Sequence, residues 1–239
     1  HDLGQNIIMD GKGYLNENAG AYAGLERYEA RKKIIEDFEK LGFYIGKKHH
    51  HNAVGHCERC HTVIEPLISK QWFVKMAPLA KPALEEYRKG NLNIIPERFG
   101  KIYENWLENI RDWNISRQLW WGHRLPVWYS DSDDEIVISR EVPSNTEGHE
   151  GKTYTQDQDT LDTWFSSALW PFSTLGWPEK TPEYDYFYPT NVLVTGYDII
   201  FFWVIRMVFS ALEQTGKLPF KDVFLNGLVR DDQGRKMSK

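Results

Sequence analysis

Two pairs of residues near the end of the chain could bind a phosphorylated ligand. Gly196 and Asp198 follow a short apolar segment. A glycine there lets a ligand approach the backbone, and the carboxylate can bind ribose hydroxyls. Lys236 and Lys239 follow a glycine-containing turn in the sequence KMSK. Two ammonium groups at this spacing can hold a polyphosphate and stabilise charge on a leaving group. Each pair alone is weak, because helix capping and solvated lysines are common.

The surrounding pattern predicts that the two pairs meet. Residues 191–195 and 220–229 are short apolar segments typical of strands, and residues 198–214 have the pattern of a helix. Alternating strands and helices indicate a parallel sheet, whose ligand crevice lies at the carboxyl ends of the strands. Both pairs follow such an end, so we expect them in one crevice.

Cys57 and Cys60 have the spacing of half a zinc knuckle. Structural zinc takes four ligands, and the chain has no second CxxC. The remaining ligands would come from Asp133 or from the histidines at positions His49, His50, His51, His56 and His61. Histidine-rich segments are often solvated loops, so zinc is a weaker prediction than a phosphate site.

Local patterns also predict the elements upstream of the crevice. Each of the first two helices stops at a glycine, Gly42 and Gly90, as expected of C-terminal caps. A hairpin with an acidic turn follows. The expected elements are helices over 25–41, 78–89 and 101–112, hairpin strands over 125–129 and 135–139, and a surface loop over 143–159.

Composition narrows the class of protein. The chain has 239 residues, 41% of them hydrophobic and 26% charged, as in ordinary globular proteins. The net charge of -5 argues against a wholly basic nucleic-acid binder, although a local basic patch can still meet phosphates. The apolar run 199–205 is far shorter than the roughly 20 residues that span a bilayer. Two cysteines and no basic-then-apolar leader favour the cytoplasm. The start at His1 suggests an excised piece.

Several longer blocks resemble the valyl-tRNA synthetases, a family of class I aminoacyl-tRNA synthetases. They are residues 112–124, 161–172 and 196–203 and the terminal KMSK, in the family's order. The resemblance covers essentially the whole chain, and its tryptophan-rich blocks account for the ten tryptophans. It implies an α/β protein that activates valine with ATP and Mg²⁺ and transfers it to tRNA-Val.

The resemblance also implies roles for individual residues. Asp198 would bind the adenosine ribose, and Gly196 would lie against the nucleotide. The residues that would hold the ATP phosphates are Lys236, Ser238 and Lys239, with the two lysines acting in catalysis.

The valine pocket would be formed by Trp164, Ile199 and Trp203. Two indoles and a branched aliphatic side chain suit a small β-branched ligand, because burial of apolar surface rewards fit. Ile199 and Trp203 stand four residues apart, so we expect them on one helix face.

The resemblance divides the chain into three regions. Residues 1–70 resemble the distal end of an editing insertion with the CxxC segment, and 71–155 a helical connective region with a hairpin. Residues 156–239 resemble the second half of a Rossmann-like nucleotide-binding fold that ends in KMSK.

Three departures from the family limit what this chain can do. It contains no His-Xaa-Gly-His, the family's other ATP signature, so we expect the isolated chain to be inactive. Its first region begins after the segment that carries the editing aspartate. Ser130 and Asp133 occupy positions where members often carry a second CxxC, and Asn114 stands where cysteine is common. This last departure argues against zinc.

Two other functions compete with this interpretation. An isoleucyl-tRNA synthetase is disfavoured by the blocks at 120–123 and 201–203. A non-enzymatic zinc-knuckle RNA-binding module centred on Cys57 and Cys60 would bind zinc and tRNA but no valyl-adenylate analogue. The sequence does not set the oligomeric state, but an exposed edge of half a sheet predicts self-association.

Overall fold

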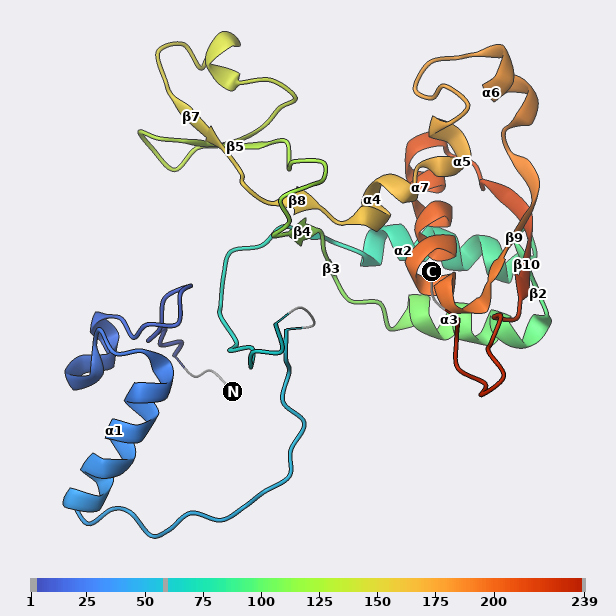
Figure 1. Ribbon diagram of the computed structural model, residues 1–239. Helices are drawn as coiled ribbons and strands as arrows, with labels where there is room; N and C mark the ends of the chain where they lie inside the picture. The colour runs from blue at the N-terminus through green and yellow to red at the C-terminus, as the bar shows by residue number, and fades with distance from the viewer. Residues whose placement is uncertain (1–3, 58–59, 238–239) are drawn as a thin grey trace. The chain divides into compact units, whose positions relative to one another are not determined.

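The computed structural model describes residues 4–57 and 60–237 and forms two compact units, His1–Lys70 and Gln71–Lys239 (Figure 1). The second unit combines helices with a parallel sheet, which confirms the α/β class. Within the described ranges, no helix is long and apolar enough to cross a membrane.

Helix α1 (Arg27–Lys40) is the main element of the first unit. The Glu26 carboxylate caps it by accepting a hydrogen bond from the backbone N–H of Tyr28 at 2.7 Å. Beyond its other end, Gly42 adopts φ 75°, a conformation that a side chain would strain. The predicted first helix and its glycine cap are therefore confirmed.

The second unit holds four small sheets. Only one of them, formed by β2, β10 and β9, is parallel. The strands are β1 (Phe73–Val74), β2 (Asn93–Ile95), β3 (Trp113–Asn114), β4 (Ser116–Arg117), β5 (Val127–Ser130), β6 (Ile136–Ile138), β7 (Tyr154–Gln156), β8 (Thr160–Leu161), β9 (Thr190–Gly196) and β10 (Phe220–Asn226). The helices are α2 (Ala77–Arg88), α3 (Gly100–Glu108), α4 (Thr163–Ser167), α5 (Trp170–Ser173), α6 (Pro182–Phe187) and α7 (Ile205–Thr215). Four short 3-10 helices are Glu17–Tyr22 in the first unit and Glu97–Phe99, Pro143–Asn145 and Tyr197–Ile199 in the second.

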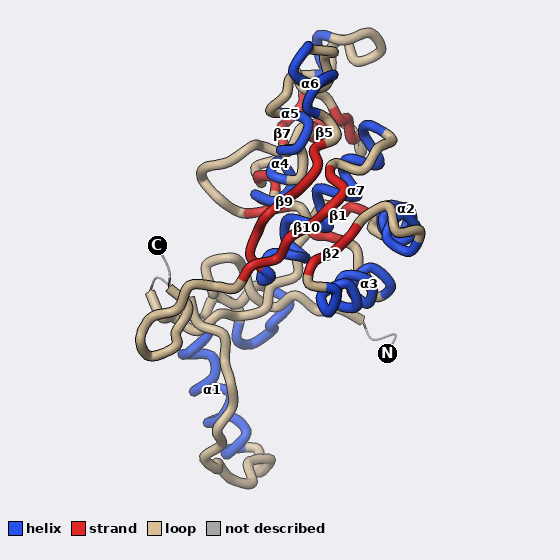
Figure 2. Tube along the Cα trace, turned by 90° about the vertical axis from the view of Figure 1, so that its right-hand side faces the viewer, coloured by secondary structure: helices blue, strands red, loops and turns tan. Residues whose placement is uncertain are grey.

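The parallel sheet forms one wall of the main core. Ile94, Val223 and Leu193 lie at matching positions of β2, β10 and β9 and are at most 7% exposed. Helices α2, α3 and α7 cover this face (Figure 2). The two predicted strands and their parallel pairing are confirmed. The third strand, β2, was not expected, and it precedes residue 156, where the nucleotide-binding region was predicted to begin.

The opposite face of the parallel sheet carries exposed apolar side chains. Ile95, Phe224 and Val194 lie at matching positions of the three strands and are 41%, 46% and 62% exposed. Parallel sheets usually have both faces covered. In the described part of the chain, no strand pairs with the outer edge of β9. An apolar face next to a free edge favours association between copies of the chain.

We expect the isolated chain to self-associate in a concentration-dependent way and the Val194→Lys variant to do so less. A lysine on an edge strand opposes edge-to-edge pairing, because its charge would have to be desolvated. Sedimentation velocity over a concentration series measures the effect. Val229→Lys is the matched control, because Val229 is 74% exposed and lies outside the strands. A parent chain that stays monomeric at every concentration would contradict the expectation.

The helix predicted over 198–214 is wrong at its start. The chain forms a 3-10 helix (Tyr197–Ile199), then a π-helix (Ile200–Val204), and becomes α-helical only in α7. The π-helix spreads a run of bulky side chains, leaving Phe202 47% exposed and burying Val204 completely. Short π-helical segments are frequent at functional sites.

The predicted hairpin is confirmed, but the loop predicted after it is partly wrong. Strands β5 and β6 pair antiparallel, as expected. Strand β7 comes from the predicted surface loop and pairs with the other edge of β5, with Ser130 opposite Tyr154. This pairing satisfies backbone groups that an isolated hairpin would leave to water.

A charged cluster joins the hairpin turn to the segment before β7. Lys152 Nζ donates to Asp133 Oδ2 at 2.9 Å and to Glu135 Oε2 at 2.8 Å. Hydrogen bonds from the Ser130 hydroxyl and from Lys152 lower the pKa of Asp133 to about 2. Ser130 and Asp133 are the positions where the sequence departs from a second CxxC, and an ion-pair cluster occupies them here.

We expect the Lys152→Met variant to raise the pKa of the Asp133 carboxyl from about 2 toward its ordinary value of 3.8, because a favourable charge is removed. Carboxyl NMR shifts measured against pH report this pKa directly. A lowered native pKa means that the cluster's contribution is complete above pH 3.8 and is lost as the pH falls through 2. Lys101→Met, in α3, is the control. An Asp133 pKa that is unchanged in Lys152→Met would contradict the proposed cause.

Candidate functional site

The two predicted phosphate-binding segments meet at the carboxyl edge of the parallel sheet. Gly196 ends β9 and pairs in register with Asn226, which ends β10. Asp198 lies just beyond β9, and Lys236 follows the turn after β10. Lys236 Nζ donates to Asp198 Oδ2 at 2.5 Å, with the two side chains 57% and 26% exposed. Residues 38 positions apart thus form an open ion pair where a ligand can reach both.

A turn organised by one aspartate positions Lys236. The Asp231 carboxylate accepts hydrogen bonds from the backbone N–H groups of Gln233 and Arg235, at 3.0 and 2.8 Å. It also accepts one from the Arg235 side chain at 2.7 Å, the main cause of the lowered pKa of Asp231. Gly234 takes φ 77°, which closes the turn. The turn therefore fixes where the KMSK segment begins.

Gly196 makes room for the Asp198 carboxylate. A Cβ at position 196 would lie 2.7 Å from Asp198 Oδ1 and 3.3 Å from a methyl of Leu228. The first distance is shorter than real carbon–oxygen contacts allow, so any side chain would displace the carboxylate. This explains in physical terms why a glycine precedes the aspartate.

Ser238 and Lys239, the other predicted phosphate-binding residues, lie outside the described residues. Of the predicted catalytic lysines, the structure therefore places Lys236 only. Its backbone is held by a bridge to Arg230, and the next residue, Met237, donates its N–H to the Val229 carbonyl at 3.1 Å.

The two predicted pocket tryptophans lie where α4 packs against the π-helix. Trp203 Nε1 donates to the Ser167 carbonyl at 3.0 Å, and Trp164 stacks on Phe202 with ring centroids 5.8 Å apart. Ile199 ends the preceding 3-10 helix and is half-buried. The expectation that Ile199 and Trp203 share a face of one regular helix is wrong, because they belong to different helix types.

A buried aspartate that the sequence did not single out supports this corner. Asp162 is 5% exposed and caps α4 by accepting a hydrogen bond from the Trp164 N–H at 2.8 Å. The same carboxylate accepts hydrogen bonds from Arg117 and from Arg206, the latter at 3.3 Å. The signal that could have found it is an aspartate directly before a helix, a common cap. Its arginine partners lie 44 or more residues away in sequence and could not be inferred.

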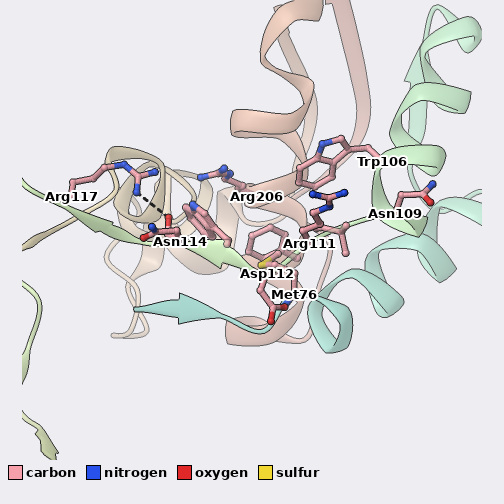
Figure 3. Close-up of a pocket in the computed structure, with 11 residues that line it drawn as sticks. Met76, Trp106, Asn109, Arg111, Asp112, Asn114, Arg117 and Arg206 are labelled. Carbon is pink, nitrogen blue, oxygen red and sulfur yellow. Dashed lines mark hydrogen bonds between the residues drawn. The ribbon is translucent and has the colours of Figure 1, made fainter. Parts of the chain in front are cut away.

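A cavity of about 430 Å³ opens beside this network, away from the Asp198–Lys236 pair (Figure 3). Its guanidinium groups come from Arg111, Arg117 and Arg206. The Arg206 guanidinium lies 3.7 Å from the centroid of the Trp113 ring, and burial lowers its pKa to about 10. Asp112 also lines the cavity and accepts a hydrogen bond from the Met76 N–H at 3.0 Å. The predicted third helix stops at Glu108, before this segment.

Cys57 and Cys60 are free thiols in the first unit. Cys60 donates to the Thr62 hydroxyl at 3.2 Å, and hydrogen bonding with Thr62 holds the pKa of Cys60 below its ordinary value. Among residues 4–57 and 60–237, no three His, Cys, Asp or Glu side chains gather where they could hold a metal ion. The structure therefore adds no third ligand to the cysteine pair.

The chain is similar over its whole length to proteins named valine–tRNA ligase. It is 60% identical to that of Carboxydothermus hydrogenoformans and 57% identical to that of Clostridium tetani, over 239 residues in each case. These matches confirm the resemblance to valyl-tRNA synthetases. They cover the whole of this chain and 27% of each relative, so the chain spans about a quarter of their length.

The fold has relatives among solved structures. Methionyl-tRNA synthetase of Mycobacterium tuberculosis in complex with methionyl-adenylate aligns with a TM-score of 0.53 and 18% identity. The alignment covers 77% of this chain and 31% of that one. The family model described as tRNA synthetases class I (I, L, M and V) matches residues 13–239. Because this match takes in nearly the whole sequence, the chain belongs to the class I tRNA synthetases.

Proposed function

We propose that this chain is part of a valine–tRNA ligase, which activates valine with ATP and transfers it to tRNA-Val. The observation that carries the proposal is 60% identity over all 239 residues to a protein of that name. The cytoplasm is the proposed compartment. The zinc-knuckle alternative has less support, because the synthetase family match includes the cysteine pair within residues 13–239.

In this proposal the Asp198–Lys236 pair marks the nucleotide site. The Asp198 carboxylate accepts hydrogen bonds from the ribose hydroxyls, and Lys236 contacts the phosphates together with Ser238 and Lys239. Without nucleotide the two charges satisfy each other at 2.5 Å, and ATP replaces that contact with one partner for each group. Gly196 lets the nucleotide approach the end of β9, because only hydrogen occupies its side-chain position.

The valine side chain would bind beside the indoles of Trp164 and Trp203, with Ile199 contributing from the preceding turn. The Trp203 N–H is already bonded to the Ser167 carbonyl, so that ring presents an apolar face without an unsatisfied donor. Both rings are half-buried, which leaves apolar surface for a ligand to cover. A small branched side chain gains most from such a site.

In the first step a carboxylate oxygen of valine attacks the α-phosphorus of ATP, and the bond to the bridging oxygen breaks. Pyrophosphate leaves with the bonding electrons, and valyl-adenylate remains. A ribose hydroxyl of the terminal adenosine of tRNA then attacks the valyl carbonyl, AMP leaves, and the hydroxyl proton is released. Lys236 stabilises charge on the pyrophosphate, and Asp198 orients the ribose, so the chain contributes positioning and electrostatics.

Mg²⁺ would supply further positive charge at the phosphates. The part of this chain that the structure describes offers no cluster of three metal-binding side chains, so the proposal leaves Mg²⁺ to the ATP phosphates. No proposed role of Asp198 or Lys236 depends on it.

The proposed specificity is tested by amino-acid-dependent exchange of pyrophosphate into ATP with the full-length ligase. We expect exchange with valine to exceed that with isoleucine, leucine and methionine. Faster exchange with isoleucine would overturn the proposal in favour of an isoleucyl enzyme.

The isolated chain is expected to show no valine-dependent exchange, because it lacks a His-Xaa-Gly-His sequence to complete the ATP site. Circular dichroism on the same sample shows whether the chain is folded. Exchange by the pure chain above the rate without valine would overturn the expectation that half of the site lies elsewhere.

A further inference from the structure

Two adjacent tryptophans project from the segment between β4 and β5. Trp120 is 105% exposed and Trp121 is 93% exposed, so neither contributes to a core. Leu119 beside them is 53% exposed. Indole rings are usually largely buried, because each carries a large apolar surface. Two fully exposed rings in succession therefore indicate a binding surface.

The ends of this segment, residues 118–124, are held in place. Before it, Arg117 pairs with Thr160 of β8. After it, the His123 carbonyl accepts the N–H of Leu161 at 2.7 Å, and Arg124 donates to the backbone carbonyls of residues 156 and 157. At position 122 a Cβ would lie 3.0 Å from the Thr160 Cβ, so only glycine lets the segment pass so close to β8. The two rings are thus presented from fixed anchor points.

The charge around the rings suits a nucleic acid. Residues 118–124 include a histidine and an arginine and no carboxylate. On the chain side, Arg117 lines the cavity that also holds Arg111 and Arg206 (Figure 3). Surfaces that bind unpaired nucleotides combine aromatic rings, which stack on bases, with cations, which contact the phosphates.

We propose that Trp120 and Trp121 form a stacking platform for unpaired RNA nucleotides, with phosphates received by the arginines that line the neighbouring cavity. The proposal rests on the proposed function, in which the substrate is a tRNA whose single-stranded 3′ end reaches this enzyme. Stacking on an aromatic ring strengthens binding by about tenfold per base and tolerates any base. The platform therefore holds the unpaired end without reading its sequence.

The test compares RNA binding by the full-length ligase and its Trp120→Ala and Trp121→Ala variants. The probes are tRNA-Val and the same tRNA trimmed of its unpaired 3′ nucleotides. Each substitution is expected to weaken binding of intact tRNA by about tenfold and to leave binding of trimmed tRNA as in the parent. Tyr186→Ala is the matched control, because Tyr186 is an aromatic residue that is 81% exposed in α6. Equal affinity of parent and tryptophan variants for intact tRNA would overturn the platform.

Hydroxyl-radical footprinting of the unsubstituted ligase gives a second readout that does not depend on variants. Both tryptophans should oxidise in the free protein and be protected by intact but not by trimmed tRNA. Rings already protected without RNA would overturn the platform and indicate contact with another part of the protein. Valine-dependent exchange, which needs no tRNA, is measured in parallel, so failure of the proposed function is distinguished from failure of the platform.

Discussion

Replacing Asp162 by asparagine is expected to lower the free energy of unfolding of the Gln71–Lys239 unit by about 3 kcal/mol. The Asp162 carboxylate faces the guanidinium groups of Arg117 and Arg206. The Arg206 side chain is only 11% exposed, so the substitution leaves a buried charge without its partner. The Arg117 side chain is 37% exposed and can turn to water, which keeps the loss near the lower end of the range for buried pairs.

Urea unfolding followed by tryptophan fluorescence measures this loss. The matched control is Glu104→Gln, which breaks a pair with Arg88 whose side chains are 33% and 50% exposed. Exposed pairs contribute less than about 1 kcal/mol, because water and salt screen them. Adding Arg206→Met to Asp162→Asn should recover part of the loss, since the unpaired charge is then gone. A loss no larger than that of the control would show that the network does not stabilise the fold.

Elements whose signals lie within a few consecutive residues could be predicted from the sequence. Helix α1 has apolar positions at helical spacing and a glycine at its end, and strands β9 and β10 are short apolar runs. The Asp198–Lys236 pair adds one rule to this local reading, that neighbouring parallel strands end at the same edge. That rule was sufficient because β9 and β10 are direct neighbours in the sheet.

Elements that depend on distant partners could not be predicted. Strand β2 is three residues long and is a strand because β10 lies beside it, although 124 or more positions separate them. Strand β7 is polar and is fixed by pairing with β5. The π-helix resembles an α-helix in its composition, and its geometry follows from packing against α4 and α7.

The candidate site shows the same division. The glycine, the aspartate and the first KMSK lysine are recognisable as short motifs. The supporting Asp162 network joins β4, α7 and the cap of α4, and no spacing in the sequence reveals that these meet. Residues that contact ligand are thus easier to find from sequence than the residues that hold them in place.

Replacing Lys236 by alanine in the full-length ligase is expected to lower kcat for valine-dependent exchange by about 10²- to 10³-fold. The reason is that Lys236 is proposed to stabilise charge that develops on pyrophosphate as the α-phosphorus bond breaks. Asp198→Ala is expected to act mainly on ATP binding and to raise KM for ATP, because it removes a contact to the ribose that exists before reaction. Steady-state exchange kinetics separate the two effects.

The Lys236–Asp198 contact makes a further, sharper expectation for the double variant. Because the two side chains touch at 2.5 Å, each single substitution also leaves its partner without a counter-charge, so the two losses should not add. Lys236→Arg should recover part of the rate by keeping the positive charge. Lys221→Ala is the control, since this exposed lysine lies near the opposite, amino-terminal end of β10 and should have no effect. Strictly additive losses, or a kcat for Lys236→Ala within twofold of the parent, would place the phosphates away from Lys236.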